Sequence, residues 1–128
     1  MIRIGDSIAS NEDFNTWVKA LRSGKYKQTR GVLQDQDGYC CLGVACEVLI
    51  PDRTKEVYEM EGITPQYLLR GNMPGEQRFA PDWLDEVDGD FGDKTRHQLT
   101  ELNDTLGFSF DEIADILEMV YKYRVLEE

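Results

Sequence analysis

The stretch from Tyr39 to Leu49 constrains the fold of this chain more than any other feature. It reads Tyr-Cys-Cys-Leu-Gly-Val-Ala-Cys-Glu-Val-Leu and is the most continuously apolar part of the sequence. Apolar residues recur from Leu42 at i, i+3, i+4 and i+7, a spacing that predicts a buried helix ending at Pro51. A chain of 128 residues is long enough for one hydrophobic core. We therefore expect a single domain, residues 1–128, built around this stretch.

An amphipathic helix is predicted before it. Phe14, Trp17, Val18 and Leu21 form one apolar stripe, Asn11 or Ser10 provides an N-cap, and Gly24 marks the end. We assign Trp17 a structural role on that stripe.

Two strands are predicted between the helices. The segments Tyr26 to Leu33 and Tyr39 to Leu42 read as a β-hairpin whose loop is Gln34 to Gly38. Gly43 then joins the second strand to the central helix. Residues 1–10, in which Ile2 and Ile4 alternate with polar neighbours, predict a short edge strand.

The remainder of the chain predicts helices separated by loops. Residues 52–93 carry a weak signal, with a helical turn at Gln66 to Leu69, a short helix at Pro81 to Val87 and a polar loop at Asp88 to Asp93. A helix from about Lys94 carries Leu99, Leu102 and Leu106, and Ser109 opens a last helix through a capping box with Glu112. The predicted fold class is α+β: an N-terminal helix, a β-hairpin, a central buried helix and a C-terminal helical hairpin.

The cysteines and the single histidine are candidates for a metal or nucleophile site. Adjacent residues on a strand point to opposite faces, so Cys40 and Cys41 are badly placed to bind one zinc ion, and His97 is distant in sequence. Free cysteine is usually buried as a small hydrophobe. We predict structural roles for Cys40, Cys41 and Cys46, with no catalytic residue, metal or cofactor.

The acidic residues exclude several functions. A net charge of −11 argues against direct binding to nucleic acid, and the polar loop lacks the ligand spacing of a calcium-binding EF-hand. The helix that Ser109 opens is acidic where a DNA reader is basic. Such a surface leaves open a DNA mimic, an inhibitor of a host nucleic-acid-binding protein.

One basic island stands against this acidic background. Five basic residues and no acidic one occur between Phe14 and Gln34, a local charge of +5 that leaves −16 for the rest of the chain. On a strand, one face of the island would pack and the other would face solvent. We predict an anion-binding site there, and pairing of these cations with the protein's own carboxylates is the alternative. The candidate binding residues are Arg22, Lys25, Tyr26, Lys27, Gln28, Thr29 and Arg30.

Composition also predicts the compartment. An odd number of cysteines and the lack of an apolar N-terminal segment argue against an oxidising compartment, and no run is long enough for a membrane span. We expect a cytoplasmic protein without membrane contact.

Three blocks of the sequence resemble a group of small, uncharacterised proteins of tailed bacteriophages and prophages. The blocks are Trp17 to Gln28 with Gly31 and Leu33, Tyr39 to Cys46, and Leu102-Asn103-Asp104 with Phe110, Ile113 and Ala114. The resemblance implies a phage accessory protein in the host bacterial cytoplasm and supplies no reaction. Within the blocks we expect Gly43, Asn103 and Asp104 to serve the structure.

Two classes of function follow. The first is a non-enzymatic accessory protein that binds or sequesters a host protein or a nucleotide-like anionic small molecule. The second is a small hydrolase or transferase that uses dispersed carboxylates or a cysteine, although no carboxylate is singled out by its spacing.

Overall fold

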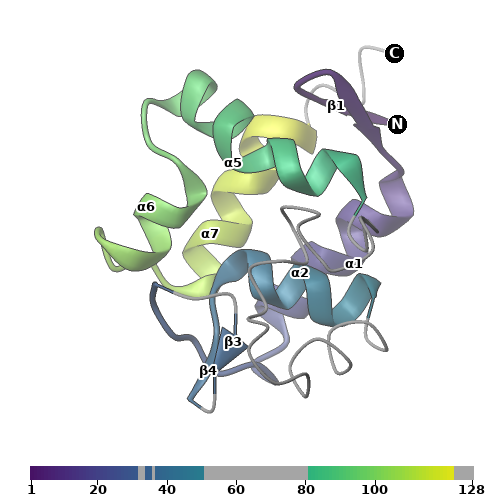
Figure 1. Ribbon diagram of the computed structural model, residues 1–128. Coiled ribbons are helices and arrows are strands. Elements are labelled where there is room, and N and C mark those ends of the chain that lie inside the picture. Colours follow the sequence, from purple (N-terminus) through teal and green to yellow (C-terminus); the bar gives the residue numbers. More distant parts are fainter. Residues whose placement is uncertain (32–33, 36, 51–80, 123–128) are drawn as a thin grey trace, which may run out of the picture.

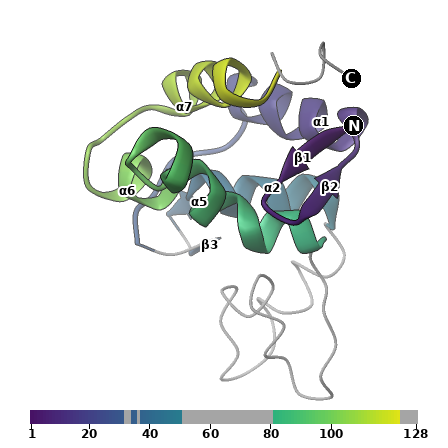
Figure 2. The same cartoon turned by 90° about the horizontal axis from the view of Figure 1, so that it is seen from above.

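The described chain is an α+β arrangement of helices around one hydrophobic core, with a small β-hairpin on either side (Figures 1 and 2). The computed structural model describes residues 1–31, 34–35, 37–50 and 81–122. The predicted turn at Gln66 to Leu69 and the stop at Pro51 lie outside these residues. None of the helices in the described part is long and apolar enough to cross a lipid bilayer.

The first ten residues form a hairpin rather than one edge strand. Strand β1 (Ile2–Ile4) pairs antiparallel with β2 (Ser7–Ala9), and the turn between them has Gly5 at a φ of +60°. Ile2 and Ile4 are buried, as their alternation suggests. The carboxylate of Glu86 accepts hydrogen bonds from the Asp6 amide and the Ser7 hydroxyl, which anchors the turn.

Helix α1 (Asn11–Arg22) matches the prediction. The hydroxyl of Ser10 caps it by accepting from the Asp13 amide at 3.1 Å, and its apolar stripe is buried. The indole Nε1 of Trp17 donates to the Cys41 carbonyl at 2.9 Å, and this bond ties α1 to helix α2 (Cys41–Leu49).

The central hairpin differs from the prediction. Strands β3 (Gln34–Asp35) and β4 (Gly38–Tyr39) are two residues each. Residues 26–31 bend at Tyr26, Arg30 and Gly31 and contribute only one isolated bridge, between Gln28 and Tyr39. Where a strand ladder was predicted, the side chains of Asn103 and Asp104, from a helix distant in sequence, form hydrogen bonds to this part of the chain. Gly38, at a φ of +150°, lies where a Cβ would collide with the Lys27 carbonyl.

Helix α2 begins earlier than predicted. Cys41 and Leu42 are its first residues rather than the end of a strand, because Cys40 is the N-cap and its Sγ accepts from the Gly43 amide at 3.4 Å. Gly43 therefore lies inside the helix and not at a strand-to-helix joint. The expected central buried helix is present, with residues 41–46 all buried.

The predicted polar loop is helical. Helix α5 (Asp82–Thr95) runs through Asp88 to Asp93, with Trp83, Leu84, Val87 and Phe91 buried along one side. Asp88 and Asp90 have partners in other elements, and Gly92 permits close approach of Gln98. The sequence predicted only the first part of this helix, Pro81 to Val87, because the glycines and aspartates that follow resemble a turn.

The C-terminal helices confirm the predicted helical pair with shifted bounds. Arg96 is left-handed, at a φ of +76°, so α6 (Leu99–Asp104) begins at Leu99 rather than near Lys94. Leu106 lies beyond α6 and is 46% exposed, so it is not part of the buried stripe. Helix α7 (Phe110–Leu117) has the predicted capping box and continues into the π-helix η1 (Glu118–Lys122).

An aromatic cluster holds these elements together. Trp17 packs against Phe14 and Trp83 at ring-centroid distances of 6.1 and 5.8 Å, and Phe14 packs against Tyr121 at 5.9 Å. Such contacts add to the burial of large apolar rings. The cluster joins α1, α5 and η1, so the N-terminal and C-terminal parts of the chain share one core.

Candidate anion-binding segment

The residues that follow α1 form a segment that we call the cationic segment (residues 25–31). Its backbone pairs with Tyr39: the Tyr39 amide donates to the Lys27 carbonyl at 2.8 Å, and the Thr29 amide donates to the Tyr39 carbonyl at 2.7 Å. The ring of Tyr26 packs edge-on against that of Tyr39 at 5.4 Å. One side of the segment is thereby fixed to β4.

Helix α6 holds the same segment from another direction. Asn103 is completely buried; its amide donates to the Thr29 carbonyl at 2.9 Å, and its Oδ1 accepts from Gln28 Nε2 at 2.8 Å. The second hydrogen of Gln28 Nε2 serves the Phe108 carbonyl at 2.8 Å. A buried polar side chain is favourable only when its hydrogen bonds are made, and those of Asn103 are.

Asp104 completes this attachment. Its Oδ1 accepts from the Gly31 amide at 2.9 Å and from Asn103 Nδ2 at 2.8 Å. Gly31 has a φ of +80°, a conformation that glycine adopts without strain. The Asn103-Asp104 pair therefore fixes the end of the cationic segment.

Lys25, Lys27 and Arg30 project from this attached backbone. All three side chains are exposed, whereas Tyr26, Gln28 and Thr29 are half-buried. None of the three cations forms an ion pair or a side-chain hydrogen bond with a residue that the structure describes. The guanidinium of Arg30 lies beside the turn at Gly107, between α6 and α7.

Arg22 differs from the other members of the predicted site. Its guanidinium binds Asp115 at 2.7 Å and Glu118 at 2.8 Å, across the α1 and α7 helices. Hydrogen bonds to Glu118 and then to Asp115 raise the pKa of Arg22. The alternative of internal ion pairing therefore applies to Arg22, which is not grouped with the three outward cations.

The residues of this network come from all three blocks noted in the sequence. Gln28 and Gly31 belong to the first block, Tyr39 to the second, and Asn103 and Asp104 to the third. Trp17 and Cys41 join the first two blocks again inside the core. No local pattern indicates that Gln28 and Asn103 pair, because 75 positions separate them.

Residues 11–121 match the family model described as a domain of unknown function, DUF8296. The chain belongs to the DUF8296 family. Neither the comparison with curated proteins nor the comparison with solved structures gave a match. The matched range includes α1, the cationic segment, α2 and α6, so the attachment of the segment lies entirely within the DUF8296 domain.

The cysteines of this DUF8296 chain lie in the core. Cys40, Cys41 and Cys46 are buried thiols that form no disulfide with a described residue. Burial raises the pKa of Cys40 to about 11 and also raises the pKa values of Cys41 and Cys46. Since the thiolate is the nucleophile and the metal ligand, these neutral thiols are inert at neutral pH. Within the described residues, no three His, Cys, Asp or Glu side chains come together as a metal site.

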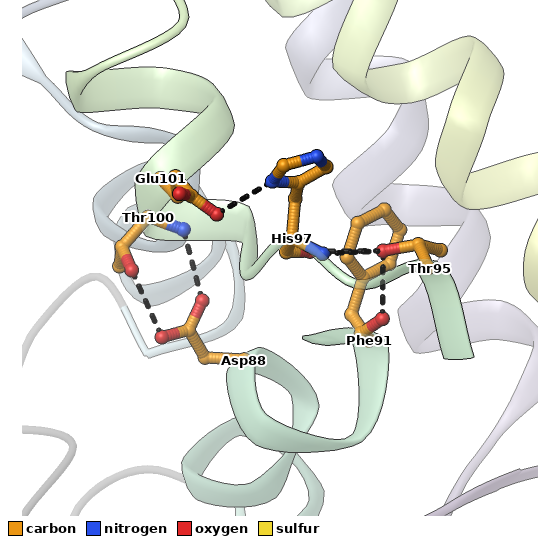
Figure 3. A network of polar contacts seen from close by, with 6 residues as sticks. All are labelled: Asp88, Phe91, Thr95, His97, Thr100 and Glu101. Atoms are coloured by element: carbon orange, nitrogen blue, oxygen red, sulfur yellow. Dashed lines mark hydrogen bonds and ion pairs between the residues drawn. The ribbon is translucent and has the colours of Figure 1, made fainter. Parts of the chain in front are cut away.

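The acidic residues of α5 hold neighbouring elements. Figure 3 shows Asp88 reaching from α5 to the start of α6, where it accepts from the Thr100 amide at 2.9 Å and from the Thr100 hydroxyl at 3.0 Å. This carboxylate serves as an N-terminal cap supplied by another helix, since Gln98 provides no side-chain cap. Asp88 thus has a structural explanation.

His97 lies in the turn between α5 and α6 and is exposed. Its Nδ1 lies 2.8 Å from the carboxylate of Glu101, and Thr95 contacts its backbone (Figure 3). The pair is local, four residues apart on the surface. It is not joined to the cysteines, which are buried in the core.

Asp90 connects two elements, α5 and η1. Its carboxylate accepts from the Tyr121 hydroxyl at 2.7 Å and pairs with Lys94. Burial opposes ionisation of Asp90, but the hydrogen bonds from Lys94 and Tyr121 outweigh it, so the pKa of Asp90 is lowered. This carboxylate is committed to joining α5 and η1.

Proposed function

We propose that this DUF8296 protein is a non-enzymatic accessory protein that binds an anionic partner through its cationic segment. The observation that carries the proposal is the exposure of Lys25, Lys27 and Arg30 without a carboxylate partner among the described residues. In a chain of net charge −11, unpaired cations gathered on one fixed segment offer an anion a local attraction that the rest of the surface lacks.

The attachment of the segment supports the proposal. A binding surface gains affinity when its backbone is ordered before the partner arrives, because binding then does not have to order that backbone. Tyr39, Asn103 and Asp104 fix the backbone, while the charged ends of the side chains remain free. The cationic segment thus combines a rigid support with adaptable contacts.

The thiols and two carboxylates of α5, groups that an enzyme could use, have structural roles in the described chain. The thiols are buried and neutral, and the carboxylates of Asp88 and Asp90 hold Thr100, Lys94 and Tyr121. These observations favour binding over the hydrolase or transferase alternative. The resemblance to tailed-bacteriophage proteins supports a role in the bacterial cytoplasm, toward a host protein or a nucleotide-like small molecule.

A thermal-shift panel tests this function. Nucleoside triphosphates, tripolyphosphate and acidic peptides are each added in excess to the full chain, and a ligand that binds only the folded state raises the melting temperature. We expect stabilisation by at least one anion, lost in Lys27→Ala and Arg30→Ala. Lys19→Ala is the matched control, because Lys19 is an exposed cation on α1 outside the segment.

Two results would overturn the proposal. One is a melting temperature that no anion on the panel changes. The other is a loss of stabilisation in Lys19→Ala as large as that in Lys27→Ala and Arg30→Ala. Stabilisation by the anion would then depend only on the net charge of the protein.

A further inference from the structure

Arg30 lies at a bend whose backbone is fixed on both sides. Before it, the Thr29 carbonyl accepts a hydrogen bond from the Asn103 side chain at 2.9 Å. After it, the Gly31 amide donates to Asp104 at 2.9 Å. The chain bends at Arg30 and Gly31 between these two attachments. The exposed Arg30 side chain therefore extends from a backbone that is ordered before any ligand binds.

The guanidinium of Arg30 lies beside the turn between α6 and α7. A Cβ at Gly107 would lie only 3.3 Å from Nη2 of Arg30, so the lack of a side chain at Gly107 leaves room for the guanidinium. Gln28 attaches the segment to the same turn, because its Nε2 donates to the Phe108 carbonyl at 2.8 Å. The turn thus sets the position of a planar group of N–H donors, whereas the two lysines of the segment extend into solvent.

A guanidinium with a lysine nearby suits a phosphate group better than a carboxylate. Two parallel N–H groups of a guanidinium bind two oxygens of one anion. A carboxylate then has both oxygens occupied and its single charge balanced, whereas a phosphate group keeps a third oxygen and carries a charge of about −1.5 to −2 at pH 7. Lys27 is three residues from Arg30, at most about 11 Å between Cα atoms, so its ammonium can reach that third oxygen.

The acidic surroundings favour a compact anion. Asp111 and Glu112 are exposed in the first turn of α7, close in sequence to Gly107. Residues 14–34 carry +5 in a chain of net charge −11, which leaves −16 for the rest. A long acidic peptide or a nucleic acid that continues beyond the segment meets this repulsion, and a small anion does not.

We infer that the ligand of the cationic segment is a small molecule with a phosphate group, which Arg30 selects through a bidentate pair of hydrogen bonds while Lys27 neutralises the remaining charge. This inference rests on the proposed function, because it specifies the anion that the segment binds. It gives the two cations different roles, so they should respond differently to substitutions that keep the charge.

Calorimetric titration of the full chain with pyrophosphate and with citrate tests the selection. Both are compact anions of nearly equal charge at neutral pH, and citrate binds through carboxylates alone. We expect pyrophosphate to bind at least tenfold more tightly than citrate. Arg30→Lys keeps the charge and removes the bidentate geometry, so it should bind pyrophosphate at least fivefold more weakly. Lys27→Arg is the matched control and should bind pyrophosphate at least as tightly as the parent chain.

NMR on the full chain locates the contact. The Nε–H resonance of Arg30 and the amide resonance of Gly107 should shift when pyrophosphate is added, because the two groups are neighbours. The Nε–H of Arg22 is the internal control, since its guanidinium is already bound by Asp115 and Glu118. An equal shift at Arg22 and none at Gly107 would contradict the placement of the phosphate at Arg30.

A second pair of probes separates a small molecule from a protein as the carrier of the phosphate. ADP should bind at least tenfold more tightly than an acetylated and amidated peptide with one phosphoserine among alanines. A phosphoserine peptide that binds more tightly than ADP would make the partner a phosphorylated protein and overturn the assignment to a small molecule.

The outcomes also separate this inference from the proposed function. Equal affinities for pyrophosphate and citrate, or unchanged binding of pyrophosphate by Arg30→Lys, overturn the selection of phosphate but leave an anion-binding segment. Binding of acetylated tetraglutamate in the absence of pyrophosphate binding has the same meaning. Failure of pyrophosphate, citrate and tetraglutamate to bind overturns both.

Discussion

The cationic segment and the first half of α2 are close in sequence, and both carry residue types associated with chemistry, yet they are used in opposite ways. In α2 and its cap the three thiols are enclosed in the core, where burial keeps them neutral. In the segment the backbone is fixed from within while three cations face solvent. The comparison teaches that reactivity follows from the partners of a side chain, more than from its type.

The largest loss of stability is expected when the contacts of Trp17 that connect α1 to α2 are removed. Trp17→Ala removes a buried ring that packs on Phe14 and Trp83 and leaves the Cys41 carbonyl without the indole donor. The free energy of unfolding should fall by about 3–5 kcal/mol in urea denaturation. Trp17→Phe, which keeps part of the packing, should cost less; equal losses would contradict the packing account.

The next effect concerns the support of the cationic segment. Asn103→Ala leaves the Gln28 amide and the Thr29 carbonyl without their buried partner, and the free energy of unfolding should fall by about 2–3 kcal/mol. Asp104→Asn retains an oxygen that accepts from the Gly31 amide, so its cost should stay below about 1 kcal/mol. An unchanged free energy of unfolding in Asn103→Ala would show that α6 does not support the segment.

Because the thiols are buried, we expect the stability of the folded chain to depend on pH above neutrality. Their pKa values are raised in the folded state, so above the ordinary thiol pKa of about 8.5 the unfolded chain loses protons that the folded chain retains. Stability should be constant between pH 7 and 8 and fall above about pH 8.5. Replacement of all three cysteines by alanine should flatten that fall relative to the parent chain.

Alkylation tests the burial of the same thiols. Under native conditions at pH 8, iodoacetamide should modify Cys40, Cys41 and Cys46 far more slowly than it does in urea, because only the thiolate reacts and burial disfavours it. Mass spectrometry after timed quenching measures the rate. A thiol that reacts as fast in the native chain as in urea would make α2 a candidate reactive site.

The smallest effect on stability belongs to the exposed cations. Lys27→Glu and Lys19→Glu should each change the free energy of unfolding by less than about 0.5 kcal/mol, because neither lysine has an ionic partner among the described residues. Urea denaturation at low salt measures both. A loss of 1 kcal/mol or more in Lys27→Glu would reveal a structural role for this charge.

The sequence predicted those parts of the fold in which one local pattern decides. The stripe of α1 and the capping box at Ser109 are local, and both are confirmed. Helix α5 was predicted only in part, because Asp88 and Asp90 resemble turn residues until Thr100 and Tyr121 are seen to bind them. Such tertiary partners leave no trace in local spacing.

The candidate site was predicted to a similar extent. Exposed Lys25 and Lys27 and half-buried Tyr26 and Gln28 follow the alternation of an extended chain. The strand pairing expected there is reduced to one bridge, because Asn103 and Asp104 supply hydrogen bonds that no neighbouring strand provides. Arg22 was grouped with the site by sequence proximity, yet its partners, Asp115 and Glu118, come from the other end of the chain.

The most direct test of the central claim is calorimetric titration of three chains with tripolyphosphate at low and physiological salt. The parent chain and Lys19→Glu should bind with similar affinity, and Lys27→Glu should bind at least tenfold more weakly, with the difference reduced by salt. Equal affinities of Lys27→Glu and the parent chain would contradict the claim that the cationic segment is the binding surface.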